Sequence, residues 1–274
     1  MEVQRYQSVD EFLASTKSFR GLDPVRNGLI TSIATSVSTG ARTYEGYFWW
    51  AALDNGEVQG IAIRTVPYGY VFSPMTIDAV EALYSYISVE DSNAQEFAGP
   101  KSVIDHLEKI SGISVSEEEA ELIYENRSLI PAQSKGSIRI AGESDFPLLF
   151  QWMTEFIEET GLRNFDLENI VRNALSAGRY SLLEVDGVPV TMGGNSDLQH
   201  FDGSSIGRVG PIYTPREFRK NGYASAITSA ITEKLLQSGA IATLYTQAEN
   251  PTSNKIYQEI GYTLVDHNRR IILA

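Results

Sequence analysis

Residues 219–224 read Arg-Lys-Asn-Gly-Tyr-Ala and lie between a strand-like run and a helix-like run in the last quarter of the chain. Upstream, residues 206–214 are rich in β-branched and small residues and are followed by a proline; downstream, residues 224–236 carry apolar residues at helical spacing. The loop therefore opens a helix, whose first N–H groups are unpaired and partly positive. Because Gly222 lets backbone approach a ligand and Ala224 keeps the first turn slim, a diphosphate would fit there.

A second motif follows the first at one strand-helix-strand distance. After a strand-like run at residues 241–246, the chain reads Asn-Pro-Thr-Ser-Asn-Lys-Ile-Tyr from Asn250 to Tyr257, and then Gln-Glu-Ile-Gly-Tyr to Tyr262. Alone, Arg-x-x-Gly-x-Ala is a weak pattern, since a plain strand-to-helix turn also explains it. Its combination with Asn-x6-Tyr-x3-Gly-aromatic is much more specific.

Together the two motifs resemble the GNAT superfamily of acetyl-CoA-dependent N-acetyltransferases, over roughly residues 204–262. The resemblance implies acetyl-CoA as cosubstrate, with its pyrophosphate held by main-chain amides of the loop. It also implies that the preceding strand splays from the next, so that freed backbone groups bind the pantetheine arm and the acetyl carbonyl. The implied cofactor contacts are Ile212, Tyr213 and Thr214 on the strand, Arg219, Lys220, Asn221, Gly222, Tyr223, Ala224 and Ser225 in the loop, and Asn250 and Asn254 beyond it.

Tyr257 falls on the tyrosine that protonates the departing thiolate in many GNAT enzymes, so the resemblance implies a catalytic role for it. The chemistry agrees, because a phenol with a pKa of about 10 is a suitable acid for a thiolate whose conjugate thiol has a pKa near 8.5. The alternative is a packed aromatic, held with Ile256 and Ile260 against the sheet.

A general base is harder to identify from the sequence. Residues 205–214 contain no Asp or Glu, so the carboxylate that some GNAT enzymes carry on this strand is missing. Glu158, Glu159 and Glu184 remain as candidates acting through water, although each is also explained as a solvated surface carboxylate. A water relay, or an amine that arrives already deprotonated, is equally compatible with the sequence.

Composition excludes several function classes. With no cysteine among 274 residues, disulfides and thiolate metal sites are ruled out, and the three widely separated histidines predict no metal site. A net charge of −13 disfavours nucleic acid and anionic membranes as partners. No run approaches the ~18 apolar residues of a membrane span and no signal peptide is evident, so we expect a cytoplasmic protein.

The C-terminal half predicts one strand, two helices, three antiparallel strands, helix, strand, helix and strand. Residues 137–141, 180–185 and 188–196 are the first three of these strands, the last two joined at Asp186-Gly187. Residues 144–159 and 167–177 are the two helices, the first of them ended by Gly161.

The N-terminal half predicts a similar start but contains no phosphate loop. We expect helices at residues 9–16, 24–38, 77–88, 100–112 and 116–126, and a hairpin of residues 47–53 and 58–67 around Asp54-Asn55-Gly56. Residues 1–135 hold 10 basic against 19 acidic residues, whereas residues 136–274 hold 12 against 16, so the less acidic half is the one expected to bind the polyanionic cofactor.

The predicted fold is α/β (α+β), with a mixed, mostly antiparallel sheet, a splayed strand pair and flanking helices. We expect residues 1–132 to form a smaller, degenerate GNAT-like domain without a cofactor loop, and residues 136–274 to form the acetyltransferase domain. The expected function is acetyl transfer from acetyl-CoA to a small-molecule or amino-acid-like amine, without metal. A catalytically silent acyl-CoA-binding or regulatory module is the alternative, and a homodimer is left open.

Overall fold

A tight two-residue turn forms one hairpin in each half of the sheet. Asn55 and Gly56 have φ angles of 51° and 82° and join β2 (Gly46–Asp54) to β3 (Glu57–Val66). Asp186 and Gly187, at 52° and 78°, join β8 (Tyr180–Val185) to β9 (Val188–Asn195). Positive φ at both central residues matches the twist of the flanking strands. Both predicted hairpins are confirmed in the computed structural model, which describes residues 1–112, 114–162 and 166–274.

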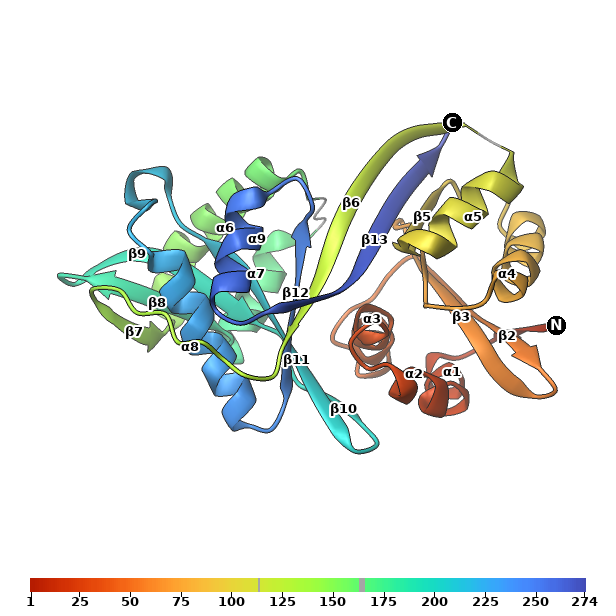
Figure 1. Ribbon diagram of the computed structural model, residues 1–274, viewed down its shortest axis with the longest axis horizontal. Coiled ribbons are helices and arrows are strands. Elements are labelled where there is room, and N and C mark those ends of the chain that lie inside the picture. The colour runs from red at the N-terminus through yellow and green to blue at the C-terminus, as the bar shows by residue number, and fades with distance from the viewer. Residues whose placement is uncertain (113, 163–165) are drawn as a thin grey trace.

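The two halves of the chain repeat one order of elements: strand, helices, hairpin, strand, helix, strand, helix, strand (Figure 1). The first half adds β1 (Glu2–Tyr6), α1 (Val9–Ser15), α2 (Lys17–Leu22), α3 (Gly28–Ser38), β4 (Tyr70–Phe72), α4 (Ile77–Glu90), β5 (Glu96–Pro100), α5 (Lys101–Ser111) and β6 (Val115–Asn126). The second half adds β7 (Ser137–Ile140), η1 (Glu143–Asp145), α6 (Phe146–Thr160), α7 (Leu167–Ser176), β10 (Gln199–Phe201), β11 (Ser204–Tyr213), η2 (Arg216–Phe218), α8 (Tyr223–Gln237), β12 (Ile241–Gln247), α9 (Pro251–Glu259) and β13 (Thr263–Leu273).

The last strand of each half is inserted next to the other half. The sheet order is β1-β2-β3-β4-β5-β13-β6-β12-β11-β9-β8-β7, with β10 paired only to β11. Strand β13 therefore lies between β5 and β6, while β6 pairs on its other edge with β12. Figure 1 shows the long strands β6 and β13 running side by side between the two groups of helices. Neither half has a complete sheet of its own, and the division into domains at residues 132–136 stays a prediction.

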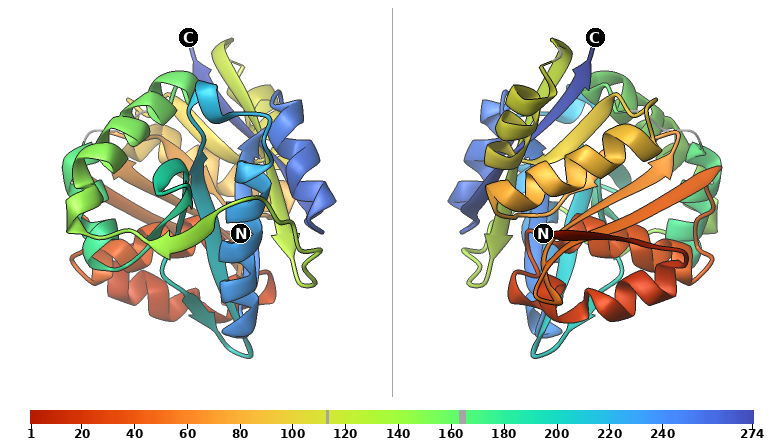
Figure 2. Two further views of the ribbon diagram at one scale, coloured as in Figure 1. Left: turned by 90° about the vertical axis from the view of Figure 1, so that its left-hand side faces the viewer. Right: turned by 90° about the vertical axis from the view of Figure 1, so that its right-hand side faces the viewer.

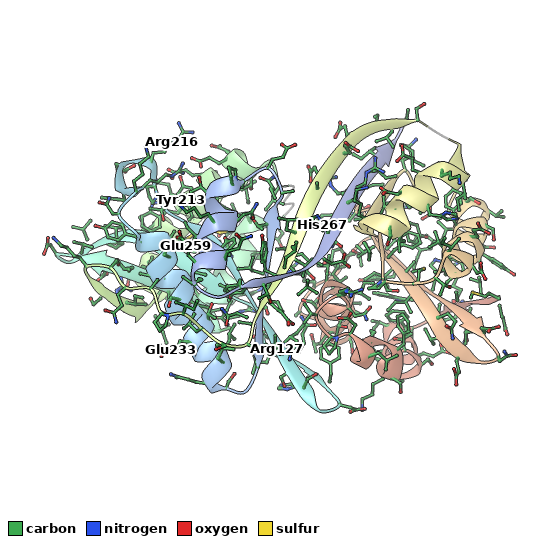
Figure 3. All side chains as sticks on the ribbon, viewed as in Figure 1. Arg127, Tyr213, Arg216, Glu233, Glu259 and His267 are labelled. Atoms are coloured by element: carbon green, nitrogen blue, oxygen red, sulfur yellow. The ribbon has the colours of Figure 1, made fainter. Side chains whose placement is uncertain are left out.

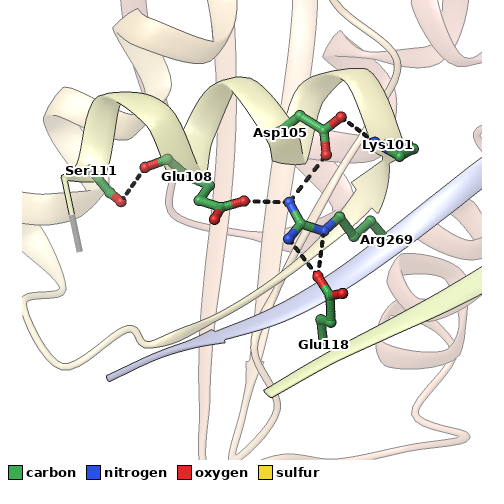
Figure 4. A network of polar contacts seen from close by, with 6 residues as sticks. All are labelled: Lys101, Asp105, Glu108, Ser111, Glu118 and Arg269. Carbon is green, nitrogen blue, oxygen red and sulfur yellow. Dashed lines mark hydrogen bonds and ion pairs between the residues drawn. The ribbon is translucent and has the colours of Figure 1, made fainter. Parts of the chain in front are cut away.

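The helix predicted at residues 116–126 is wrong, because this segment is strand β6. Its run of Glu and Ala favours a helix locally, but cross-strand ion pairs override that preference. Arg269 on β13 contacts Glu118 of β6 and reaches Asp105 and Glu108 of α5 (Figure 4). The neighbouring Arg270 binds Glu119 of β6 at 2.5 Å and Glu96 of β5 at 2.6 Å. These ion pairs connect the two halves across the exchanged strands.

Alternation along the strands gives the sheet two covered faces. The adjacent residues Leu182 and Leu183 point to opposite sides, since successive strand residues alternate. Leu182 packs in the core under α6 and α7, whereas Leu183 packs in the core under α8. In the first half, Trp49 and Trp50 divide in the same way between the core of α1 and α3 and that of α4 and α5. Figure 2 shows helices on both sides of the strands in each half.

The predicted fold class is confirmed: the sheet is mixed and mostly antiparallel, with β4–β5 and β11–β12 as its parallel pairs among the residues described. The remaining predicted helices and strands lie within a few residues of their expected bounds, and Gly161 ends α6 with a φ of 68°. Strands β1, β4, β5 and β10 and helix α2 were not predicted, because each is short. No helix in the described part of the chain is long and apolar enough to cross a membrane.

Candidate active site

Strands β11 and β12 pair for only three residues and then separate. Residues 206–208 pair in parallel with residues 241–243. Beyond that point β11 continues beside β9 up to Tyr213, while β12 continues beside β6 up to Gln247. The facing edges of residues 209–213 and 244–247 therefore lack a strand partner in the described structure, and we call this divergence the splay. A splayed strand pair was predicted, and it is present.

The loop after β11 has the geometry of an anion-binding turn. Lys220 and Gly222 have φ angles of 66° and 78°, whereas φ of Asn221 between them is negative. Such alternation turns successive backbone N–H groups toward one point. Gly222 is the N-cap of helix α8 and offers no capping side chain; the first internal hydrogen bond of the helix runs from the Ala226 amide to the Gly222 carbonyl. The amides of the first turn are thus free to bind an anion.

Gly222 is required for its backbone angle rather than for space. A Cβ atom at this position would meet no atom within 4 Å, but a φ of 78° is strained for a residue with a side chain. The first turn of α8 contains no acidic residue. Negative charge from a ligand would therefore meet the positive end of the helix unopposed.

Arg219 holds the loop in place, although its side chain is exposed. Its Nε donates to the Thr214 carbonyl at 2.8 Å, and its guanidinium binds Glu159 of α6 at 2.6 Å. Arg216 binds the same carboxylate at 3.2 Å. Burial would raise the pKa of Glu159, but the hydrogen bonds from Arg219 and Arg216 outweigh it and lower this pKa. Glu159 is therefore a charged anchor of the loop and a poor candidate for a base.

A pocket of about 450 Å³ opens beside the loop, between α6 and the end of β11. Tyr213 forms part of its wall and donates a hydrogen bond to Glu155 at 2.9 Å. Burial and this bond to a carboxylate raise the pKa of Tyr213 to about 12, so it stays protonated. Figure 3 places Tyr213 and Arg216 close together at this end of the molecule. The pocket is lined by Gln151, Trp152, Glu155, Glu158, Glu159, Tyr213, Pro215, Arg216 and Glu217.

Asn250 and Asn254 fasten the turn between β12 and α9. The Asn250 side chain caps α9 by accepting from the Ser253 amide at 3.1 Å. Asn254 donates to the carbonyls of Gln247 and Ala248, at 3.3 and 3.2 Å, and its own carbonyl oxygen is buried without a partner. An unpaired buried acceptor of this kind is available to a ligand.

Tyr257 lies on α9 and packs between two other tyrosines. Its ring centroid is 6.4 Å from that of Tyr124 and 6.1 Å from that of Tyr262. Burial raises the pKa of Tyr257 to about 12, against a smaller lowering by a hydrogen bond with Ser253. The residue is therefore a packed aromatic and also a phenol that stays protonated, so its predicted catalytic role stays a prediction.

The predicted residues are brought together in two groups around the splay. Ile212, Tyr213, Thr214 and the loop residues Arg219 to Ser225 lie on one side, at the end of β11 and the start of α8; Asn250, Asn254 and Tyr257 lie on the other, after β12. Glu184 lies apart from both groups and binds Arg139 at 2.7 Å, so it is not positioned as a base. Sequence reasoning missed Glu155, although its spacing from Glu158 and Glu159 marks one face of α6.

In the described residues, no group of three or more acidic or histidine side chains is arranged to hold a metal ion. The site therefore consists of backbone amides, the unpaired edges of two strands, and neutral or ion-paired side chains. Such an arrangement can bind a polyanion at the loop and present N–H donors to a developing oxyanion in the splay.

Comparison with known proteins identifies the fold. Residues 201–271, which contain both motifs, match the model of the family described as FR47-like protein. A GNAT-family acetyltransferase from Colwellia psychrerythraea is 11% identical, with 100% of both chains covered and a TM-score of 0.68. A tandem GNAT protein from the clavulanic acid biosynthesis pathway is 9% identical, with 98% of both chains covered and a TM-score of 0.65.

A GCN5-related N-acetyltransferase from Sphaerobacter thermophilus is 12% identical, with 99% of this chain and 96% of that chain covered and a TM-score of 0.65. No curated protein sequence matches the chain. At these identities the likeness concerns the fold. The chain has the fold of the GNAT acetyltransferases, as its two motifs predict.

Proposed function

We propose, from the GNAT acetyltransferase fold and the open amides at the start of α8, that this protein transfers an acetyl group from acetyl-CoA to the primary amine of a small acceptor. The observation that carries the proposal is the loop itself. Its φ angles alternate in sign, its helix has no side-chain cap, and it directly follows the strand that leaves its neighbour. These three features serve a ligand that combines a diphosphate with an extended arm.

The residues around the loop fit coenzyme A. The amides of residues 220–225 would hold the pyrophosphate, and the unpaired edge of β11 near Ile212 would pair with the amide groups of the pantetheine arm. The buried, unpaired carbonyl oxygen of Asn254 is suited to accept from the same arm. Acetyl-CoA supplies an activated thioester to the site.

The strand edge also suits the chemistry of acyl transfer. When an amine attacks the thioester carbonyl, negative charge develops on its oxygen, and N–H donors already fixed on β11 stabilise that charge. The leaving thiolate needs a proton, and Tyr257, with its pKa raised to about 12 by burial, remains protonated and able to donate it. In this proposal Tyr257 is the general acid.

Free-thiol release tests the proposal. The full-length protein is incubated with acetyl-CoA and a panel of amines, and the coenzyme A thiol is followed with a chromogenic reagent. Thiol release stimulated by one class of amine, with the acetylated amine found by mass spectrometry, would support the enzyme. If acetyl-CoA binds but no amine increases thiol release, the protein is an acyl-CoA-binding module without turnover.

A further inference from the structure

A group of polar side chains lies on one face of the sheet where the splay begins. Arg208 is at the last position where β11 pairs with β12. Its partner on β12 is Thr243, and Tyr245 lies two residues after Thr243, opposite Ile123 of β6. Glu121 lies on the same face, since it is two residues from Ile123, and it is opposite Asn268 of β13. We call Arg208, Tyr245, Glu121 and Asn268 the splay cluster.

Arg208 is a buried cation without an anion. Its guanidinium lies 5.9 Å from the centre of the Tyr245 ring, but it forms no hydrogen bond or ion pair with any residue in the described ranges. The side chain lies deep among protein atoms, which lowers its pKa, yet part of it still reaches solvent. Arg42 is near enough to lower this pKa further and also has no ion-pair partner in those ranges.

Arg42 is exposed, so the unpaired charge that needs compensation is that of Arg208. Burial of an unpaired charge is unfavourable unless something compensates it. The Tyr245 hydroxyl adds a further donor here, because it is buried beside the backbone of Leu29 and makes no hydrogen bond of ordinary geometry. This end of the splay cluster presents donors and positive charge, which suit a carboxylate.

The other end of the splay cluster presents acceptors and negative charge. Glu121 forms no hydrogen bond or ion pair with a described residue, and the oxygen of the Asn268 amide is buried without a partner. Burial, then the nearby Glu119, raise the pKa of Glu121, while Arg270 and Arg208 lower it. Arg208 and Glu121 thus influence each other's pKa but form no ion pair, so each remains available to a ligand group of opposite charge.

The splay cluster differs from the pocket under α6, where Glu155 and Glu159 already have partners within the protein. There Glu159 is bound by two arginines and Glu155 by Tyr213, so neither is left for a ligand. In the splay cluster the donors and the acceptors both remain unpaired, on the strands that bear the splay.

On the basis of the proposed function, we infer that the acceptor is a free amino acid or a similar zwitterion, held with its carboxylate on Arg208 and its ammonium group facing Glu121 and Asn268. Glu121 takes one proton from the ammonium group and later releases it to solvent. The amine nitrogen then forms a bond to the thioester carbon and the carbon–sulfur bond breaks. Tyr257 gives its proton to the leaving thiolate, and the second proton lost by the nitrogen returns to Tyr257 through solvent.

The test compares each amino acid with its own decarboxylated amine. The wild-type protein is assayed with the twenty common L-amino acids, and the best acceptor is then compared with the amine of the same skeleton that lacks the carboxylate. We expect kcat/KM to be about 10²-fold higher for the amino acid. Decarboxylated amines that are acetylated equally well or better would overturn the inference while leaving the proposed function intact. Failure of every amine would instead overturn the proposed function.

Two variants test the roles proposed for Arg208 and Glu121. Arg208→Gln should raise KM for the amino acid by about 10²-fold and change kcat/KM for the matched amine less than about 3-fold. Glu121→Gln should lower kcat for both acceptors by about 10²-fold without weakening acetyl-CoA binding. Arg127→Gln is the control and should behave as wild type. It removes an exposed arginine that follows β6 and binds Glu125 near the end of that strand.

An equal loss on both acceptors in Arg208→Gln would assign Arg208 a structural role and overturn the inference. If Arg208→Gln does not fold, the comparison of acceptors with the wild-type protein still decides. Unchanged kcat in Glu121→Gln would remove Glu121 as the proton acceptor.

Discussion

Helices α4 and α8 occupy equivalent places in the two halves of the sheet, but only α8 begins with free amides. Each helix connects two parallel strands, β4 to β5 in one half and β11 to β12 in the other. The side chain of Thr76 caps α4 by accepting from the Ala79 amide, and Asp78 adds a negative charge to its first turn. Helix α8 has Gly222 in place of a capping side chain and no acid in its first turn.

The strand pairs that these helices connect also differ, because β4 and β5 stay together whereas β11 and β12 separate. A Cβ atom on Gly99 of β5 would be only 2.8 Å from the carbonyl oxygen of Phe72 on β4, so these two strands stay in contact to the end of β4. Strands β11 and β12 instead separate after three paired residues. The same order of elements therefore occurs twice, but the start of α4 is capped by its own side chains, whereas the start of α8 is uncapped and lies beside the splay. Ligand binding is expected only at the open one.

The largest expected effect comes from separating the halves. Because β6 lies between β13 and β12, the fragment of residues 133–274 loses the strand that both of them pair with. We expect this fragment to show no cooperative thermal transition by circular dichroism and to bind no acetyl-CoA. Mixing it with residues 1–132 should restore both properties. A fragment that melts cooperatively alone would show that the exchanged strands are dispensable and that the second half is self-sufficient.

Tyr257→Phe is expected to have the next largest effect. Loss of the phenol proton should lower turnover by about 10²-fold, with acetyl-CoA affinity and melting temperature little changed. Since burial raises the pKa of Tyr257 to about 12, the wild-type rate should show no loss of this acid until pH approaches that value.

Tyr262→Phe is the matched control for this prediction. Tyr262 packs beside Tyr257, and its hydroxyl is bonded to Thr232 at 2.7 Å. The change should cost about 1 kcal/mol of stability and leave turnover intact. Near-wild-type turnover of Tyr257→Phe, with chemistry shown to be rate-limiting, would leave solvent as the proton source.

The sequence could predict the second half better than the first for a physical reason. Positive φ angles at Gly56, Gly187 and Gly222 favour glycine, so a hairpin is predictable in each half, but the loop at Gly222 is predictable in the second half alone. Strand β6 is not, because its acidic run resembles a helix until Arg269 and Arg270 of β13 are placed beside it. Glu121 was missed together with that strand, since its position depends on pairing with residues more than a hundred positions away.

Glycine substitutions at the two ends of α8 sharpen the role of its open start. Gly222 and Gly239 have φ angles of 78° and 80°, and a Cβ atom at either would meet nothing within 4 Å. Valine should therefore strain both turns similarly and lower stability by similar amounts. Only Gly222→Val should weaken acetyl-CoA binding, by about 10-fold or more, because it disturbs the amides at the N-terminus. Calorimetry measures both affinities, and equal affinities in the two variants would remove the loop as the diphosphate site.

The smallest expected effect comes from removing a cap. Thr76→Ala and Asn250→Ala each delete the side chain that caps a helix, α4 and α9 respectively, and each should cost about 1 kcal/mol in denaturant unfolding. Thr76→Ala should still bind one acetyl-CoA per chain with wild-type affinity, since Asp78 remains at the start of α4 and the strands beside it do not separate. Asn250→Ala should bind acetyl-CoA more weakly as well, because Asn250 is a predicted cofactor contact. If Thr76→Ala binds a second acetyl-CoA, then the cap on α4 is what prevents binding in the first half, and the splay is not required for binding.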